Sequence, residues 1–427
     1  MQADQRVFLF LQGPHGPFFA QLARQLRLTG AKVLRVGFNA GDQAFWSDRT
    51  SYIPFRETLA DWPETLEAIL VKHAVTDIVL YGDTRPTHAQ ACKIGRAQDL
   101  RLHVFEEGYL RPYWISYERG GANGHSSLMD IGLETIKAAE HTRPFELPVP
   151  PSHWGDLRQH IFYGALYHWF VLCWNQGYPS FEPHRALTVN KEFALHLKRL
   201  VLMPAHSVDR RIATARVRLG GFPYHLALLQ LEHDSAFQMH GPFADQRGFI
   251  KEVISGFAEG APQHHHLVFK AHPLEDGRAP LKRDIREIAA HHGLAKRVHF
   301  IRGGKLARLL DEAVSAVTVN STAGQQALWR GIPLRAFGAS VYGKAGLVST
   351  QPLAAFFANP DRPDSSAYRI FRAFLLATSQ LPGSFYAAKG RRQVLRHVPD
   401  KMLQDIGPYA RYQKENAADE QQLRLVK

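Results

Sequence analysis

At 427 residues, the chain is too long for a single ordinary hydrophobic core, so we expect two domains. Hydrophobic residues make up 45% of the chain and charged residues 21%, which is the composition of a soluble globular protein. The formal net charge of +13 indicates an anionic partner, such as a nucleotide, a nucleic acid or an anionic membrane surface, unless it only reflects a generally basic surface.

Cysteine content and apolar patterning indicate a cytoplasmic location. Cys92 and Cys173 form no CxxC pair, which excludes a disulfide framework and a cysteine zinc site. The first residues, MQADQRVFLFLQGPHGP, have no basic n-region and no small-residue cleavage site, so we expect no signal peptide. No apolar stretch reaches the ~20 residues that a membrane span needs.

The first 150 residues alternate between strand-like and helix-like segments. Continuous apolar runs predict buried parallel strands at 6–13, 31–39, 76–83 and 101–108. Segments with helical spacing predict helices between them, at 18–30, 60–74 and 87–100. This alternation predicts a doubly wound, mostly parallel sheet, and we assign 1–150 to an N-terminal Rossmann-like acceptor domain.

The alternation stops at a proline-rich stretch and then resumes. Residues 141–155 are rich in proline, and we assign 151–221 to a helical insert or linker. From residue 222 the strand–helix rhythm restarts, which predicts a second Rossmann-like domain over 222–384. The polar, basic tail at 385–427 is expected to be helical with a frayed end. Two such domains with a helical insert suggest a GT-B glycosyltransferase with a central cleft.

Motifs for a metal-bound diphosphate are missing from the sequence. It contains no DxD and no GxGxxG, and the GASVYGK segment at 338–344 has alanine where a P-loop needs serine or threonine. Consecutive histidines at 264–266 point to opposite faces of a strand, so we expect no metal there. We therefore expect neither a metal nor a cofactor.

Two strand ends in the second half carry residues suited to a single phosphate. Lys270 and His272 share one side of the strand in FKAHP, and Pro273 fixes the turn after it. In VNSTAG, Asn320, Ser321 and Thr322 stand between a strand and a helix, where they either cap the helix or face an anion. Together they fit a sugar nucleotide that has one phosphate and needs no metal.

Other polar residues or glycines follow strands and are candidates for lining the cleft. After the first strand of the second domain come Asp234 and Ser235, which either contact the donor or belong to a solvated loop. In the first domain the candidates are either acceptor contacts or turn residues: Gly13, His15, Gly16, Asn39 and Asp83.

The segment VFEEGYLRP places two glutamates where a strand ends. Adjacent carboxylates repel unless both are solvated or one of them is used. Because successive strand residues point to opposite faces, only one of Glu106 and Glu107 should enter the cleft.

These segments together resemble the capsule polysaccharide biosynthesis/export family, and more narrowly its KpsS-type β-Kdo transferases. The resemblance spans most of residues 7–350 and rests on VFEEGYLRPYWISYERGGANGHSS, LQGPHGPFFAQLARQL, EHDSAFQMHGPF, FKAHPLEDG and VNSTAGQQALWRGIPL. It implies a GT-B fold, CMP-Kdo as donor, and a phosphatidylglycerol-type lipid acceptor at the cytoplasmic face of the inner membrane. Other capsule biosynthesis and ABC-export proteins are then candidate partners.

The resemblance also implies roles for the strand-end residues. His272, Pro273, Ser321 and Thr322 would hold the CMP moiety, and Lys270 would help to neutralise its phosphate. Retention at a β-linked Kdo favours double displacement, with Glu107 as nucleophile and Glu106 as its second choice or partner.

Residues beyond the glutamates complete the expected catalytic set. Arg111 would bind the Kdo carboxylate, and His125 or Asn123 would serve in acid–base catalysis. Another CMP-sugar transferase, either a sialyltransferase or an enzyme that extends a Kdo chain, and a non-catalytic export component remain alternatives. No nucleic-acid-binding module appears, so nucleic acid is not expected as a partner.

An aromatic segment is a candidate for contact with a membrane surface. FYGALYHWFVLCW at 162–174 is too short to span a bilayer but contains tryptophan and tyrosine, which favour its interface. It is either a peripheral membrane contact or a buried core helix.

Overall fold

The computed structural model describes residues 5–151, 157–182, 205, 207–273, 275 and 277–413. The chain forms two compact units, one built from Met1–Ile131, Ala138–His184 and Ala373–Lys427, the other from Gly132–Lys137 and Arg185–Arg372. Helices α5 (Leu133–Thr142) and α14 (Ser365–Thr378) each contribute to both units.

The first unit contains a sheet with the order β12-β6-β5-β4-β1-β2-β3 in the described residues. Its strands from β3 to β5 are parallel, whereas β6 is antiparallel to both β5 and β12. The strands are β1 (Val7–Phe10), β2 (Lys32–Gly37), β3 (Tyr52–Pro54), β4 (Asp77–Tyr81), β5 (Arg101–Glu107), β6 (Trp114–Arg119) and β12 (Gln380–Pro382).

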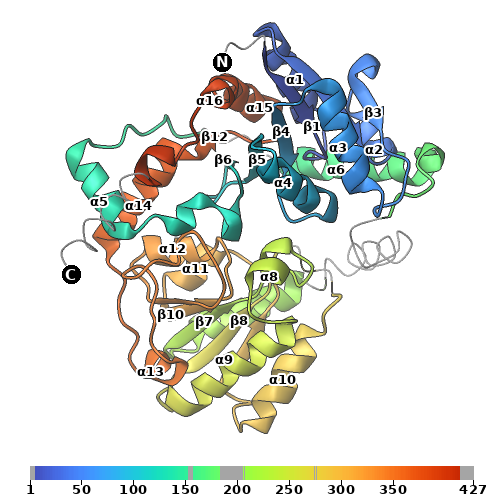
Figure 1. The fold of residues 1–427 in the computed structure, drawn as a ribbon. Helices are drawn as coiled ribbons and strands as arrows, with labels where there is room; N and C mark the ends of the chain where they lie inside the picture. The colour runs from blue at the N-terminus through green and yellow to red at the C-terminus, as the bar shows by residue number, and fades with distance from the viewer. Residues whose placement is uncertain are drawn as a thin grey trace. The chain divides into compact units, whose positions relative to one another are not determined.

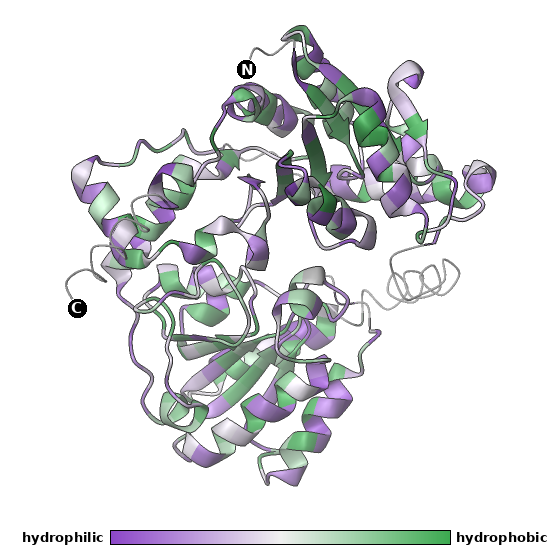
Figure 2. Ribbon diagram, in the orientation of Figure 1, coloured by the Kyte–Doolittle hydropathy of each residue, from purple (hydrophilic) through white to green (hydrophobic). Residues whose placement is uncertain are grey.

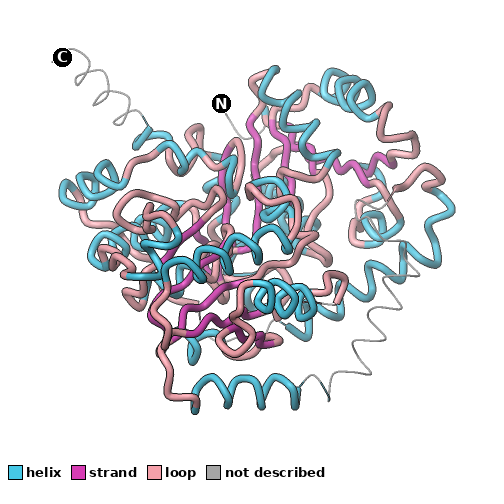
Figure 3. The backbone as a smooth tube through the Cα atoms, turned by 90° about the horizontal axis from the view of Figure 1, so that it is seen from below, coloured by secondary structure: helices cyan, strands magenta, loops and turns pink. Residues whose placement is uncertain are grey.

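Helices cover both faces of this sheet (Figure 1 and Figure 3). One core lies between the strands and α1, α15 and α16, and the other between the strands and α3 and α4. A strand buried on both faces needs apolar residues at every position, which the VFLF run of β1 supplies, and Figure 2 shows these central strands as hydrophobic. The helices are α1 (Phe18–Leu28), α2 (Ala40–Ala44), α3 (Trp62–His73), α4 (Pro86–Ala97), α6 (Leu157–Trp174), α15 (Ala388–Leu395) and α16 (Val398–Leu403).

The second unit contains a fully parallel sheet with the order β11-β10-β7-β8-β9 in the described residues. Its main core packs α9, α10 and α13 against the strands. The strands are β7 (Tyr224–Leu228), β8 (His266–Lys270), β9 (Val298–Ile301), β10 (Ala313–Thr318) and β11 (Leu334–Ala336). The helices are α8 (Ser235–His240), α9 (Gln246–Gly260), α10 (Leu281–His291), α11 (Leu306–Leu310), α12 (Gly324–Trp329) and α13 (Leu353–Ala358).

A mostly parallel sheet in the first unit and a fully parallel sheet in the second confirm the predicted α/β class with two Rossmann-like domains. The predicted boundaries need correction. Strand β12 and helices α15 and α16 belong to the first unit. The chain therefore re-enters the first unit at residue 373, and 385–427 is not a separate tail. The predicted insert at 151–221 is likewise divided, since the structure assigns α6 to the first unit and the helical residues 207–219 to the second.

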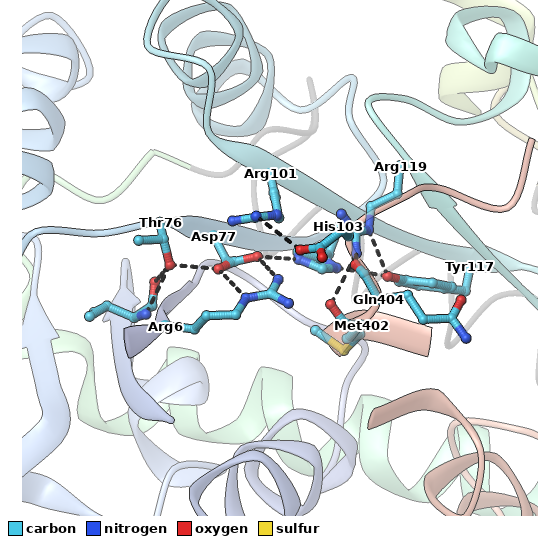
Figure 4. A network of polar contacts seen from close by, with 11 residues as sticks. Arg6, Thr76, Asp77, Arg101, His103, Tyr117, Arg119, Met402 and Gln404 are labelled. Carbon is cyan, nitrogen blue, oxygen red and sulfur yellow. Dashed lines mark hydrogen bonds and ion pairs between the residues drawn. The ribbon is translucent and has the colours of Figure 1, made fainter. Parts of the chain in front are cut away.

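A buried polar network holds the returning chain to the first sheet (Figure 4). The Asp77 carboxylate accepts hydrogen bonds from Arg6, from His103 Nε2 at 2.7 Å and from Thr76 Oγ1 at 2.6 Å. The other ring nitrogen of His103 is hydrogen-bonded to the Tyr117 hydroxyl, which also accepts from Arg119. Arg119 in turn donates to the backbone oxygen of Met402 in the last turn of α16 and to that of Gln404 just after the helix. Although burial alone would raise it, the pKa of Asp77 lies well below its ordinary value because of these donors.

Candidate active site

The pleat of β5 separates the two adjacent glutamates. Glu106 pairs with Ser116 and Glu107 with Ile115 across the β5–β6 ladder. Glu107 therefore shares its face with Phe105 and the core that contains Ile115, whereas Glu106 lies on the opposite face with Ser116 and Glu118. Both carboxylates are partly exposed, and the prediction that they point to different sides of the sheet is confirmed.

Glu107 lies beside two tyrosines, the partly buried Tyr81 and the buried Tyr386. The Tyr81 hydroxyl donates to Glu107 Oε1 at 3.3 Å, and the same hydroxyl interacts with that of Tyr386. Burial, followed by the Tyr386 and Glu107 oxygens, holds the pKa of Tyr81 well above its ordinary value. Tyr81 thus keeps its proton, and its hydroxyl fixes the position of one oxygen of the Glu107 carboxylate.

The turn after β5 depends on residues of the EEGYLRP motif. A Cβ on Gly108 would lie 2.3 Å from the Trp114 oxygen, so only glycine fits there. The Arg111–Pro112 bond is cis, and Arg111 Nε donates to the Gly108 oxygen at 3.3 Å. Arg111 is otherwise exposed at the tip of the turn, and its contact with a Kdo carboxylate stays a prediction.

The face of the sheet that carries Glu106 also carries three other predicted residues. Asp83 is buried, and its carboxylate accepts from the Ala122 N–H at 3.1 Å and contacts His125 Nδ1 at 3.1 Å. Asn123 has φ of +54°, and its N–H donates to the Tyr109 hydroxyl at 2.7 Å. Asp83 thereby fixes the loop that presents the half-exposed His125 imidazole, an arrangement suited to proton transfer.

A fully buried carboxyl, which sequence reasoning missed, supports this loop. Glu118 on β6 is 0% exposed and receives hydrogen bonds from Ser126, Tyr109 and, at 3.4 Å, Tyr409. Burial raises its pKa to about 7, despite these donors. The signal in the sequence was weak, because an alternating strand such as WISYER normally points its glutamate to solvent.

The remaining candidates of the first unit make internal contacts. Gly13 and Gly16 lie against the rings of Phe19 and Tyr163, so their lack of a side chain accommodates the protein's own aromatics. His15 stacks on Tyr167 with ring centroids 4.1 Å apart. Asn39 is 0% exposed and caps α2 through Asp42 N–H while donating to the Tyr167 hydroxyl at 2.7 Å. These contacts are those of turn and support residues, and a contact of any of them with an acceptor stays a prediction.

Lys270 is a buried cation at the carboxyl end of β8. Its side chain is 5% exposed, and among the described residues its only hydrogen-bond partner is the Ala271 oxygen at 3.4 Å. Burial lowers the pKa of Lys270 to about 8. A buried ammonium without an acidic partner is costly, and an anionic ligand would stabilise it.

Asn320 links the ends of β7 and β10, at the point where the order of the strands in the second sheet reverses. Strand β7 lies between β8 and β10, and the connections leave on opposite sides, which is where open α/β sheets bind ligands. Gln230 Nε2 donates to Asn320 Oδ1 at 2.7 Å, and Asn320 N–H returns a bond to Gln230 Oε1 at 3.0 Å. Asn320 is thus a brace for the site, and Gln230 is a residue that sequence reasoning missed.

The other predicted donor residues gather at the same edge. Ser321 Oγ accepts from the Ala323 N–H at 3.2 Å, and Ser321 oxygen receives the Tyr342 hydroxyl at 2.5 Å, while Thr322 follows directly. Asp234 is the N-cap of α8, and Ser235 is its first residue. His272 is partly exposed and Pro273 exposed, immediately beyond β8. Within the residues that the structure describes, no cluster of three or more ligating side chains could hold a metal ion.

The comparisons with known proteins identify the family. The model of the "Capsule polysaccharide biosynthesis protein" family matches residues 76–386. The Escherichia coli capsule polysaccharide export protein KpsS is 30% identical over 384 residues, covering 89% of this chain and 97% of KpsS. The capsule polysaccharide modification protein LipB of Neisseria meningitidis serogroup B is 33% identical over 391 residues, covering 89% of this chain and 91% of LipB. The chain belongs to the capsule polysaccharide biosynthesis family.

Two solved structures resemble this member of the capsule family. A KpsC from Thermosulfurimonas dismutans, named as a β-Kdo 2,7 transferase, has a TM-score of 0.44 at 11% identity and covers 92% of this chain and 99% of its own. Anabaena HepE in complex with UDP and glucose has a TM-score of 0.33 at 11% identity and covers 98% of this chain and 100% of its own.

In this capsule-family protein, the aromatic segment forms α6, and both of its predicted roles have a counterpart on the helix. One face packs on the first unit through Tyr163 and Tyr167. Five large apolar side chains of the helix are exposed: Ile161, Phe162, Trp169, Leu172 and Trp174. No described helix combines the length and apolarity needed to cross a membrane.

Proposed function

We propose that this protein is a retaining glycosyltransferase that moves Kdo from CMP-Kdo to a phosphatidylglycerol-type lipid and so starts the linker of a capsular polysaccharide. The observation that carries the proposal is Lys270. A buried ammonium at a ligand-binding edge, without a carboxylate among the described residues, suits the single phosphate of a CMP-sugar. Membership of the capsule family and the resemblance to its KpsS-type β-Kdo transferases support Kdo as the sugar.

The donor would be held by the edge of the second sheet. Lys270 would pair with the phosphate, while Ser321 and Thr322 would hydrogen-bond the CMP moiety next to His272 and Pro273. Asn320 would not contact the donor itself but would support the site, since its hydrogen bonds to Gln230 hold the ends of β7 and β10 together. No metal is required in this scheme, because one phosphate charge can be met by one ammonium.

The chemistry would run as two displacements at C2 of Kdo. In the first, a Glu107 oxygen attacks C2, the bond from C2 to the phosphate oxygen breaks, and CMP leaves with the bonding electrons. In the second, a lipid hydroxyl attacks C2, the bond to Glu107 breaks, and the hydroxyl proton passes to a general base. Two inversions retain the β configuration, and Arg111 would bind the sugar carboxylate.

Intact-protein mass spectrometry tests this scheme most directly. With CMP-Kdo and no lipid, the wild-type protein should accumulate a covalent Kdo adduct, and Glu107→Gln should not. Glu106→Gln is the matched control, because it removes a neighbouring charge on the opposite face. If the adduct forms in folded Glu107→Gln but not in Glu106→Gln, the two assignments are exchanged.

Product analysis decides among the alternative functions. Mass spectrometry of the lipid after incubation with CMP-Kdo should reveal one or more Kdo residues on phosphatidylglycerol. Hydrolysis of CMP-sialic acid in preference to CMP-Kdo would indicate a sialyltransferase. A wild-type protein that does not bind CMP in calorimetry would instead be a non-catalytic export component.

We further propose that the exposed face of α6 contacts the cytoplasmic face of the inner membrane. Ile161, Phe162 and Leu172 are 62%, 60% and 61% exposed, which is unusual for large apolar side chains in one helix. Replacing Ile161 and Leu172 with serine should reduce flotation with anionic liposomes. The matched control is Val71→Ser on α3, where the side chain is 78% exposed. Equal flotation of all three proteins would refute this contact.

A further inference from the structure

The first unit contains a pocket that none of the proposed donor residues line. It has a volume of about 220 Å³ and lies beyond the carboxyl ends of β1, β2 and β3 and at the start of α4. In this sheet β1 lies between β4 and β2, so the pocket lies where the strand order reverses. The residues that carry the argument are Gln12, Phe38, Phe55, Arg85, Thr87 and Phe181.

One end of the pocket is equipped for an anion. Arg85 donates to Gln12 Oε1 at 3.3 Å, and no carboxylate of the described residues pairs with its guanidinium. Thr87 is 8% exposed and lines the pocket, yet in the described part of the chain its hydroxyl has no hydrogen-bond partner. The α4 helix of twelve residues begins here with neither a capping side chain nor an acidic residue in its first turn. A cation, a free hydroxyl and a helix N-terminus thus converge on one place.

Gln12 fixes the orientation of this anionic end. It is 6% exposed, and its Nε2 donates to Asp42 Oδ2 at 3.1 Å and to the Tyr167 hydroxyl at 3.2 Å. With the amide nitrogen held, the amide oxygen must face Arg85. Gln12 is therefore a positioning residue that directs the guanidinium and does not itself supply the charge.

The opposite wall of the pocket is aromatic. Phe38 and Phe55 belong to the apolar core and pack edge to face with centroids 5.6 Å apart, and Phe181 packs against the same core. The exposed carboxylates of Glu57 and Glu182 also line the pocket. Exposed carboxylates accept hydrogen bonds from hydroxyls, so the ligand this pocket suits has an apolar part, a phosphate and free hydroxyl groups.

We infer that this pocket binds the phosphoglycerol head and the first hydrocarbon segment of an anionic glycerophospholipid. Arg85 and Thr87 hold the phosphodiester, the rim glutamates accept from the glycerol hydroxyls, and the phenylalanines cover the hydrocarbon. The inference rests on the proposed function for its biological meaning, because such a lipid would be the acceptor. Its binding chemistry, however, requires no sugar donor and is measured without one.

The experiment measures binding of dihexanoyl phosphatidylglycerol below its critical micelle concentration, by calorimetry. Arg85→Gln and Thr87→Val should each raise the Kd, Arg85→Gln by about tenfold, the equivalent of about 1.4 kcal/mol. Arg24→Gln, an exposed arginine on α1, is the matched control and should bind as the wild type does. Dihexanoyl glycerol, glycerol phosphate and inorganic phosphate should each bind more weakly than the complete lipid, because each lacks part of the recognised chemistry.

The outcomes separate this inference from the proposed function. The inference that this pocket binds the lipid is refuted if both folded pocket variants bind it with wild-type affinity, or if the wild-type protein does not bind it. Equal affinity for inorganic phosphate and the lipid also overturns it, since the apolar wall then contributes nothing. If the lipid binds in an Arg85-dependent manner but no Kdo is transferred, the pocket stands and the proposed reaction fails. If transfer proceeds with an unchanged KM for lipid in Arg85→Gln, the reaction stands and the pocket fails.

Discussion

The buried carboxyl of Glu118 predicts how the stability of the first unit changes with pH. In the folded chain burial raises its pKa to about 7, from an ordinary value of 4.5. Between these two values the folded state keeps a proton that the unfolded state has lost, so stability must fall as the pH rises through this window. At about 1.36 kcal/mol per pKa unit, the loss between pH 4.5 and pH 7 is roughly 3 kcal/mol.

Glu118→Gln keeps the shape and hydrogen-bonding capacity of the side chain but cannot ionise. Urea denaturation followed by near-UV circular dichroism from pH 4.5 to pH 8 should show the wild-type stability falling and that of Glu118→Gln falling less. The difference between the two proteins is the relevant quantity, because other titrating groups contribute to both. Glu67→Gln, an exposed glutamate on α3, should follow the wild type. A wild-type minus Glu118→Gln difference that stays constant between pH 5 and pH 7 would refute the reasoning.

Three further predictions follow from buried polar groups. Lys270→Met should abolish measurable CMP binding in calorimetry, and wild-type affinity should fall as the pH rises through about 8, where Lys270 loses its charge. Asp77→Asn leaves the Arg6 guanidinium buried without a counter-charge and should destabilise the protein by about 3–5 kcal/mol in urea, with wild-type CMP binding if the second unit stays folded. Gln230→Leu should weaken CMP binding by about tenfold through the loss of its bonds to Asn320, whereas an unchanged Kd would show that the brace is dispensable.

Local patterns were sufficient to predict most of the parallel strands. VFLF and DIVLY are buried on both faces and therefore apolar at successive positions, which is what the sequence displays. The same logic could not find β12, because its three residues, QLP, have no periodicity of their own and become a strand only by pairing with β6. The pairing partner lies more than 260 residues earlier in the chain, and this separation explains why the boundary at residue 384 was misplaced.

Within the candidate site, the predictable part was where polar residues lie, not what they do. Parallel strands bring their carboxyl ends to one edge, so Asn39, Asp83 and Asn320 were expected at ligand-binding positions from their place in the chain alone. Whether a side chain is available depends on long-range partners. Asn39 is used by Tyr167 and Asn320 by Gln230, and neither partner is adjacent in sequence.

Polar groups with few protein partners are the stronger evidence for function. Burying the Lys270 ammonium beside a single backbone oxygen costs stability, which a bound anion would recover, and the Thr87 hydroxyl lines its pocket without a partner among the described residues. In each unit such a group lies where the strand order of the sheet reverses, and in each its chemistry suits a phosphate. Two sites suited to binding phosphate, one on each unit, are what a transferase needs when its donor is a nucleotide sugar and its acceptor is a phospholipid. A non-catalytic export component would have no reason to keep both, so loss of CMP binding in Lys270→Met and of lipid binding in Arg85→Gln, each without the other, would argue for a two-substrate enzyme.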